Sequence, residues 1–268
     1  RGCTVIATVR TRGKGVTFKA GKGVGTVTRA GLPIAVGEPA INPVPREMMR
    51  AVIEEQGGGD VEIEISIPDG EALAQKTWNP RLGIVGGLSI LGTTGIVHPF
   101  SCAAWIASIH RGVDVARTMG LTHIAGCTGS TSEDAVRAHF NLPLEAMMDM
   151  GDFAGGLLKY VREHPVARIT IGGGIGKMTK LAQGAMDLHS GRSQIDFEWL
   201  TRFAPESLHG EVKAANTAQQ VLDMLGGNLA QHVAREAKFQ IDKTLRGAPM
   251  AANVMIVDRA GKIIAHAE

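Results

Sequence analysis

The feature that most restricts the fold is a repeated order of elements: an apolar run, a glycine turn and then a helical segment. Apolar runs that end in glycine lie at 82–85, 121–126 and 167–173, and helical patterns follow at 130–140 and after the glycines at 172–176. This order is typical of a parallel α/β sheet, whose ligands bind at the carboxyl ends of the strands. The pattern therefore predicts a Rossmann-like parallel α/β domain over residues 81–268.

The part before residue 80 has a different pattern, which predicts a β-rich α+β domain over residues 1–80. "DVEIEISIP" alternates charged and apolar residues, as a half-buried strand does, and the segment 46–56 after Pro45 is a helix that ends at Gly57. The chain begins at Arg1 without Met, so we expect this domain to be incomplete at its N-terminus. Further strands are expected at 4–10, 16–19 and 25–28, further helices at 153–164, 197–203, 214–225 and 228–245, and a C-terminal β-hairpin around 258–261.

Composition argues against several classes of protein. The apolar stretch 79–101 is interrupted by Gly86-Gly87 and by 92–95, which argues against a membrane span. A net charge of +2 does not indicate a nucleic-acid binder. The three cysteines are odd in number and far apart, so we expect no disulfide framework and a cytoplasmic protein. The 35 glycines indicate many tight turns or close backbone approaches.

Common catalytic and metal-binding motifs do not fit. The dinucleotide, Walker and nucleophile-elbow patterns each fail at one or more positions. Two His-x-x-x-Cys pairs, His98/Cys102 and His123/Cys127, resemble metal ligands, but four residues of strand span ~13 Å. We therefore expect no metal site, and we interpret these residues as buried thiols and loop histidines.

Three glycine-rich turns, at 21–25, 83–95 and 172–176, remain without an assigned role. Each is either a tight turn or a place where backbone N–H groups meet a ligand. Two of them follow predicted strands, with hydroxyl or ammonium groups nearby that suit a carboxylate, a phosphate or a nucleoside. The pattern alone leaves the ligand open.

At these residues the sequence resembles a known family. "GKGVGTVTRAGL", "GEPAINPVPREMM", "NPRLGIVGGLSILGTTGIVHPFS" and "GGGIGKMTKLAQGAMDLHS" resemble, in order and spacing, the signature blocks of the cobalt-precorrin-5B C(1)-methyltransferases of cobalamin biosynthesis. The family's usual N-terminal block, of the type Gly-Tyr-Thr-Thr-Gly-Thr-Cys-Ala, is absent. Where the family often has His-Thr-His-Ser, this chain has Asp-Leu-His-Ser, so that only His189 and Ser190 correspond.

The resemblance implies transfer of a methyl group from S-adenosylmethionine to carbon 1 of cobalt-precorrin-5B, which gives cobalt-precorrin-6A. His189, with His98 second, is the expected acid–base group; as a helix-terminal residue His189 would instead stabilise the helix dipole. The carboxylates of the corrinoid should meet cations. For about half of the candidate Lys and Arg residues the alternative, a solvated surface charge without a ligand, is expected to hold. The methyl donor is expected at Gly86, Gly87, Ser89, Gly92, Thr93 and Thr94, and the corrinoid at Lys22, Arg29, Arg46, Arg81, Lys177, Lys180 and Ser190.

Three other functions stay open. The same methylation could act on a metal-free precorrin, and the β-rich first domain also suits a small-molecule phosphotransferase, although paired carboxylates for Mg²⁺ are not evident. A tetrapyrrole-binding protein without catalysis is the third. We expect no nucleic-acid or membrane partner, and the sequence leaves a homo-oligomer open.

Overall fold

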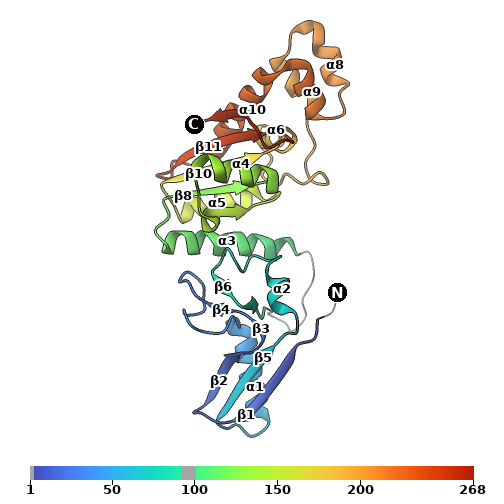
Figure 1. Cartoon of the computed structure of the whole chain (residues 1–268). Coiled ribbons are helices and arrows are strands. Elements are labelled where there is room, and N and C mark those ends of the chain that lie inside the picture. Colours follow the sequence, from blue (N-terminus) through green and yellow to red (C-terminus); the bar gives the residue numbers. More distant parts are fainter. Residues whose placement is uncertain (1–2, 92–100) are drawn as a thin grey trace. The chain divides into compact units, whose positions relative to one another are not determined.

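The computed structural model describes residues 3–91 and 101–268, and the chain divides into two compact units between Ala104 and Trp105. It is a mixed α/β protein with several sheets (Figure 1). The division lies later than the expected residue 80 because two short strands at 84–88 pair with strands at 23–27 of the first unit. In the described part of the chain, no helix is long and apolar enough to span a bilayer.

Unit 1 contains a three-stranded sheet with β5 (Val61–Ser66) in the centre. It pairs antiparallel with β1 (Ile6–Thr11) and parallel with β2 (Val16–Ala20). Burial alternates along β5, and Met49 and Ile53 of helix α1 (Pro43–Glu55) pack against its buried face. The strands predicted at 4–10, 16–19 and 60–68 and the helix after Pro45 are thus confirmed.

The rest of unit 1 is built from very short strands. β3 (Gly23–Val24) pairs with β7 (Gly87–Leu88), β4 (Thr26–Val27) pairs antiparallel with β6 (Ile84–Val85), and α2 (Gly70–Ala74) lies beside them. The prediction that residues 82–85 belong to the parallel α/β sheet is therefore wrong. A Cβ atom on Gly70 or Gly87 would overlap the backbone of Gly23, so these three glycines allow three segments to approach closely.

Unit 2 contains a five-stranded sheet in the order β12-β11-β10-β8-β9. Within this sheet, β8, β9, β10 and β11 run parallel to one another, and β12 is antiparallel to β11. The predicted strands at 121–126 and 167–173 and the C-terminal hairpin are confirmed, whereas β9 was not predicted. The bounds are β8 His123–Cys127, β9 Met147–Asp149, β10 Arg168–Gly173, β11 Ala251–Val257 and β12 Ile263–Ala267.

Helices cover both faces of this sheet. Val136 of α4 (Ser130–Phe140) packs with Cys127 on one face. On the other face, a Cβ on Gly126 would meet Leu157 of α5 (Ala154–Glu163). Helix α10 (Gly227–Leu245) packs on β11 and β12 and also contacts α5. The core of unit 2 therefore lies on both sides of β8 and β10.

Two of the remaining helices, α3 and α8, were not predicted. Helix α3 (Cys102–Thr118) buries Ile109, Gly112, Val113 and Ala116, which have helical spacing. Helix α6 ends before Gly184, which has a φ of 92°. The remaining bounds are α6 Ile175–Ala182, α7 Phe197–Leu200, α8 His209–Lys213 and α9 Ala218–Leu225, with 3₁₀ turns at Leu144–Ala146, Thr201–Phe203 and Glu206–Leu208.

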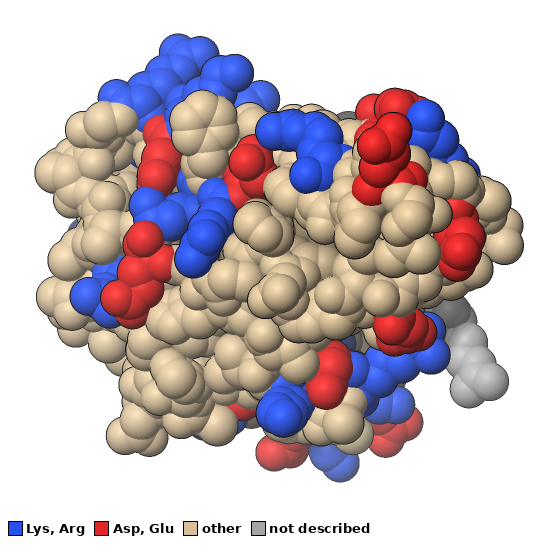
Figure 2. All heavy atoms as spheres, turned by 90° about the horizontal axis from the view of Figure 1, so that it is seen from above, with Lys and Arg blue, Asp and Glu red and all other residues tan. Residues whose placement is uncertain are grey.

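Charge does not single out a binding face in the view of Figure 2. Among the described residues seen there, Lys and Arg side chains are interspersed with Asp and Glu. This mixture agrees with the net charge of +2.

Candidate functional site

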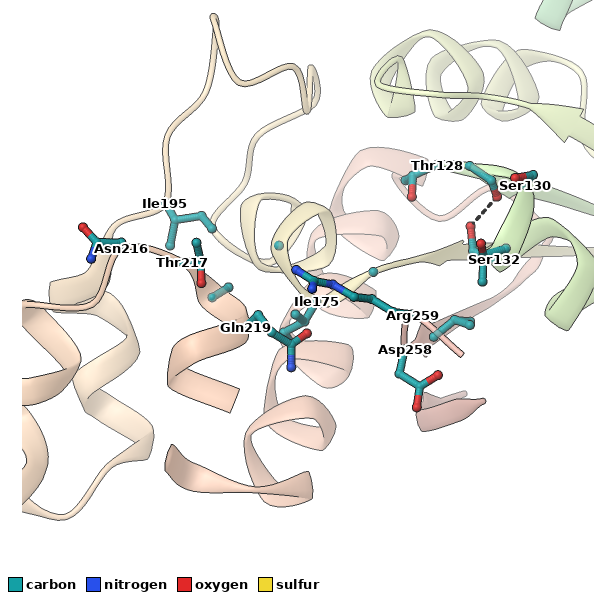
Figure 3. A pocket seen from close by; sticks show the side chains of 16 residues that line it. Thr128, Ser130, Ser132, Ile175, Ile195, Asn216, Thr217, Gln219, Asp258 and Arg259 are labelled. Atoms are coloured by element: carbon teal, nitrogen blue, oxygen red, sulfur yellow. Dashed lines mark hydrogen bonds between the residues drawn. The ribbon is translucent and has the colours of Figure 1, made fainter. Parts of the chain in front are cut away.

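A cavity of about 560 Å³ opens at the carboxyl ends of β8, β10 and β11 in unit 2. Its lining consists of the segments 128–132, 174–176, 216–219 and 257–259 together with Ile195 (Figure 3). Segments that are far apart in the sequence meet here because parallel strands end at the same edge of a sheet.

The strand order explains why a cavity forms at this edge. β9 follows β8 in the chain and lies on one side of it, whereas β10 lies on the other side. The loop after β8 leads into α4 on one face, and the loop after β10 leads into α6, whose Met178 packs near Gly173 on the other face. Because the two loops diverge, they leave a crevice between them.

The glycines around this crevice fall into two kinds. A Cβ on Gly172 would lie 2.7 Å from Val136, and one on Gly173 would lie 2.7 Å from Thr128, so packing requires glycine at both positions. A Cβ on Gly129 or Gly176 would meet nothing within 4 Å, and neither residue has a left-handed φ. The fold does not require glycine at 129 and 176, where the bare backbone is open to the cavity.

Hydroxyl groups flank Gly129 on both sides. Thr128, Ser130 and Thr131 line the cavity, and the Ser132 hydroxyl donates to the carbonyl of Gly129 at 2.8 Å. The helix predicted at 130–140 is confirmed. Gly129 is the N-cap, and no side chain caps the helix.

Helix α9 also begins at the cavity, and the side chain of Thr217 caps its N-terminus. The Thr217 hydroxyl accepts a hydrogen bond from the Gln220 N–H at 3.2 Å, and the Gln220 side chain accepts one from the Asn216 N–H at 3.0 Å. Helices α4, α6 and α9 all begin at the cavity. The first N–H groups of a helix have no partner within the helix, so these starts favour a negatively charged group.

Among the described residues that line the cavity, Arg259 is the one cation and Asp258 is the one anion. The Asp258 carboxylate accepts hydrogen bonds from the N–H groups of Ala260 and Lys262, both at 2.9 Å, which fixes the β11–β12 turn. The exposed Arg259 side chain extends from this turn across the cavity toward Ile175 (Figure 3).

Most of this site was not predicted. The sequence drew attention to the glycines at 172–176, but not to 128–132 as ligand-facing residues, nor to 216–219 or 257–259. A glycine among four hydroxyl residues directly after a buried strand, "CTGSTS", was a usable signal. Arg259 and Thr217 carry no local signal, because only the sheet topology brings their segments to the cavity.

The residues expected to bind the methyl donor lie in unit 1 or outside the described residues. Gly87 lies against the backbone of Gly23, and the Ser89 hydroxyl donates to the side chain of buried Asn79 at 3.1 Å. Asn79 in turn donates to the Gly87 carbonyl at 2.8 Å. Gly86 is exposed with a φ of 90°. Gly92, Thr93, Thr94 and His98 lie outside the described residues.

Of the unit 1 cations expected to bind the corrinoid, Arg46 has clear local partners. Its guanidinium donates to the carbonyls of Ile41 and Pro39 at 2.8 and 2.9 Å, and it pairs with Glu38 at 2.9 Å. This geometry gives Arg46 a structural role at the start of α1. Lys22 is exposed, Arg29 packs against Gly83, and Arg81 lies over the ring of Trp78.

In unit 2 the structure brings Lys177 and Lys180 together. Both ammonium groups donate to the carbonyl of Leu188, at 3.1 and 3.2 Å, and Lys177 also pairs with Asp152. Burial, together with the neighbouring charge of Lys177, lowers the pKa of Lys180. The two lysines thereby fix the chain directly before His189.

His189 lies in an exposed turn, so the alternative that it ends a helix is wrong: α6 ends at Ala182. Its Nδ1 accepts a hydrogen bond from the Gly191 N–H at 3.0 Å. Burial alone would raise the pKa of Asp187, but hydrogen bonds from the His189 N–H and from Arg192 outweigh it and lower that pKa. Ser190 is exposed, and its carbonyl accepts from the side chain of Gln194.

The second His-x-x-x-Cys pair occupies opposite ends of the predicted strand β8, and Cys127 is buried. The interpretation of both thiols as buried is wrong for Cys102, which is exposed. The His123 Nε2 lies 2.9 Å from the hydroxyl of Thr170, and the Cys127 thiol donates to the carbonyl of Ser132 at 3.7 Å. Within residues 3–91 and 101–268, no three His, Cys, Asp or Glu side chains are grouped so that they could hold a metal ion.

Comparison with known proteins identifies relatives along nearly the whole chain. The chain is 57% identical over 279 aligned residues to the cobalt-precorrin-5B C(1)-methyltransferase of Brucella anthropi, covering 98% of this chain and 76% of that protein. The protein of the same name from Brucella canis is 56% identical with the same coverage. A crystal structure of the cobalamin biosynthesis protein cbiD from Archaeoglobus fulgidus is 28% identical, with a TM-score of 0.26, over 64% of this chain and about half (54%) of that one.

Family assignment agrees with these relatives. The family CbiD matches residues 1–99, and the family described as CbiD, C-terminal domain, matches residues 187–268. Together with 57% identity over 98% of the chain, these matches establish the family. The chain belongs to the CbiD family.

Proposed function

We propose that this chain transfers a methyl group from S-adenosylmethionine to carbon 1 of cobalt-precorrin-5B and so produces cobalt-precorrin-6A. The observation that carries the proposal is 57% identity to a cobalt-precorrin-5B C(1)-methyltransferase over 98% of the chain. The geometry of unit 2 supports it, because a cavity of about 560 Å³ falls within the ~300–1,000 Å³ typical of small-molecule sites. The strand order and the helices on both faces favour a Rossmann-like class for this unit.

The task of the protein follows from the chemistry of the two substrates. Bound S-adenosylmethionine supplies a methyl group that is already activated as a sulfonium. The residues of the chain have to align the acceptor carbon with that methyl group, an effect that can be worth several kcal/mol. They also have to exclude water, because the positive charge disappears in the transition state.

His189 is our candidate for acid–base assistance. Because its Nδ1 accepts the Gly191 N–H, the neutral imidazole carries its proton on Nε2. The side chain is exposed, so Nε2 can exchange a proton with a ligand or with water. The tether at Leu188, formed by Lys177 and Lys180, supports a fixed position for this turn.

Cations are proposed to hold the carboxylates of the corrinoid. Lys22 and Lys177 retain exposed side-chain surface, and Arg29 and Arg81 are partly buried beside turns of unit 1. Arg46 is the least suited of the expected residues, because its guanidinium already has three local acceptors. Raised salt should therefore weaken binding of the acceptor more than binding of the donor, which has one carboxylate.

The test is a methylation assay with defined substrates. The purified chain is incubated with cobalt-precorrin-5B and S-adenosylmethionine carrying a labelled methyl group, and the product is examined by mass spectrometry. We expect one added methyl group, located at carbon 1. The metal-free precorrin serves as the competing acceptor, and ATP with Mg²⁺ tests phosphoryl transfer. Corrinoid binding without methyl transfer would contradict the proposal and favour a carrier.

A further inference from the structure

We infer that the cavity at the carboxyl ends of β8, β10 and β11 is the binding site of the methyl donor, with Arg259 pairing the donor's carboxylate. This inference rests on the proposed function and moves the donor from the expected loop at 86–94 to unit 2. Three features carry it: the position of the cavity in the sheet, its glycines, and its charge.

The position in the sheet favours a small ligand. In an open parallel sheet, ligands bind outside the carboxyl ends of the strands, at the point where the strand order reverses. Here that point lies between β8, which β9 follows on one side, and β10 on the other. The cavity includes the residues directly after both strands, 128–132 and 174–176.

The glycines of the cavity point to close approach of a ligand. Gly129 and Gly176 have neither a packing reason nor a backbone reason to be glycine. In unit 1 the situation is the reverse, because Gly87 is required by its contact with the backbone of Gly23, and Ser89 is engaged by Asn79. Packing therefore explains Gly87 in unit 1, whereas the fold gives no reason for glycine at Gly129 and Gly176 in the cavity.

The charge of the cavity selects the donor over the acceptor. Arg259 is the one cation of the lining, and it makes no hydrogen bond or ion pair with the residues that the structure describes. One guanidinium beside three helix starts suits one carboxylate, which the donor has. An early corrinoid carries many carboxylates and would need several cations. Ile175, Ile195 and Val257 supply apolar surface for the remainder of the donor.

The experiment measures binding of S-adenosylhomocysteine, the stable demethylated donor, by calorimetry on the full chain. Gly176→Val is paired with Gly210→Val: each glycine is the second residue of its helix, and a Cβ at either meets nothing within 4 Å. Gly176→Val should weaken binding more than tenfold, and Gly210→Val should leave it unchanged. Arg259→Ala should weaken binding about tenfold, and Arg235→Ala, which removes an exposed arginine of α10, should not.

Photo-crosslinking of labelled S-adenosylmethionine, followed by peptide mapping, gives an independent readout. Label on the peptides of 128–132, 174–176, 216–219 or 257–259 supports the inference, and label on the peptide of 86–94 overturns it. If the wild type binds and methylates while Gly176→Val and Arg259→Ala bind as well as their controls, the inference fails and the proposed function stands. A wild type that neither binds nor methylates would overturn both.

Discussion

Replacing Arg46 by Ala should destabilise unit 1 without affecting ligand binding. The guanidinium donates to two backbone carbonyls, those of Ile41 and Pro39, and 16% of the side chain is exposed. Allowing for that exposure, the two bonds contribute about 1 kcal/mol each, below the ~1.5–3 kcal/mol typical of bonds to charged groups. The pair with exposed Glu38 adds ~0–1 kcal/mol, and the contact over the Phe18 ring adds ~0.5–1 kcal/mol. The free energy of unfolding should therefore fall by about 2.5–4 kcal/mol.

Arg50 offers a matched control one turn along α1. Its guanidinium lies over the same Phe18 ring, 5.0 Å from the centroid, but it forms no hydrogen bond with the described residues. Arg50→Ala should cost only the ring contact, ~0.5–1 kcal/mol. Hydrogen exchange of the α1 amides measures the difference within unit 1, at about tenfold faster exchange per 1.4 kcal/mol. Arg46→Lys should recover only part of the loss, because an ammonium cannot reproduce the guanidinium fork.

A purely structural role of Arg46 would be refuted by the opposite pair of results. If α1 exchanges equally in Arg46→Ala and Arg50→Ala, while the KM for the corrinoid rises tenfold or more in Arg46→Ala alone, the arginine holds substrate. A rise in KM that accompanies the loss of stability would give Arg46 both roles.

Three further predictions concern unit 2 and the glycine contacts of unit 1. Burial is the main cause of a lowered pKa at three histidines, His110, His123 and His266. Because the unfolded chain therefore takes up protons that the folded chain does not, the free energy of unfolding should be at its full value above about pH 6.5 and should fall below that pH. A urea midpoint that is unchanged at about pH 5.5 would contradict this. Burial and then the hydrogen bond to Asp114 raise the pKa of Tyr160 to about 12. Because it is the chain's one tyrosine, phenolate absorbance should stay low near pH 10, where an exposed tyrosine is half ionised. Gly87→Ala should cost roughly 1–3 kcal/mol or more in a denaturant titration, since its Cβ overlaps the backbone of Gly23; a wild-type midpoint would disprove the contact.

Local patterns predicted the elements that depend on local interactions. The alternation in 61–66 reflects one buried face, and the apolar residues of β8 and β10 reflect burial on both faces. The run at 82–85 has the same composition, but its partner is β4, which lies more than fifty residues earlier. Hydrophobicity indicates that a segment is buried, and it does not indicate which strand the segment pairs with.

The candidate site was predictable only in part for the same reason. Gly172 and Gly173 stood out in the sequence, yet packing explains them, whereas Gly129 and Gly176 face the cavity. Arg259 lies in an ordinary-looking hairpin turn. Its position at the cavity depends on β11 lying beside β10, a pairing between residues about eighty positions apart.

The contact of Gly23 with Gly70 and Gly87 limits how unit 1 can change during evolution or in the laboratory. A larger side chain in a protein core is usually accommodated when a neighbour becomes smaller. Here each neighbour is backbone or already glycine, so no second substitution can release the space. We expect a randomised library of unit 1 to retain all three glycines among its folded members, and a variant that loses one of them to find no compensating partner at the other two.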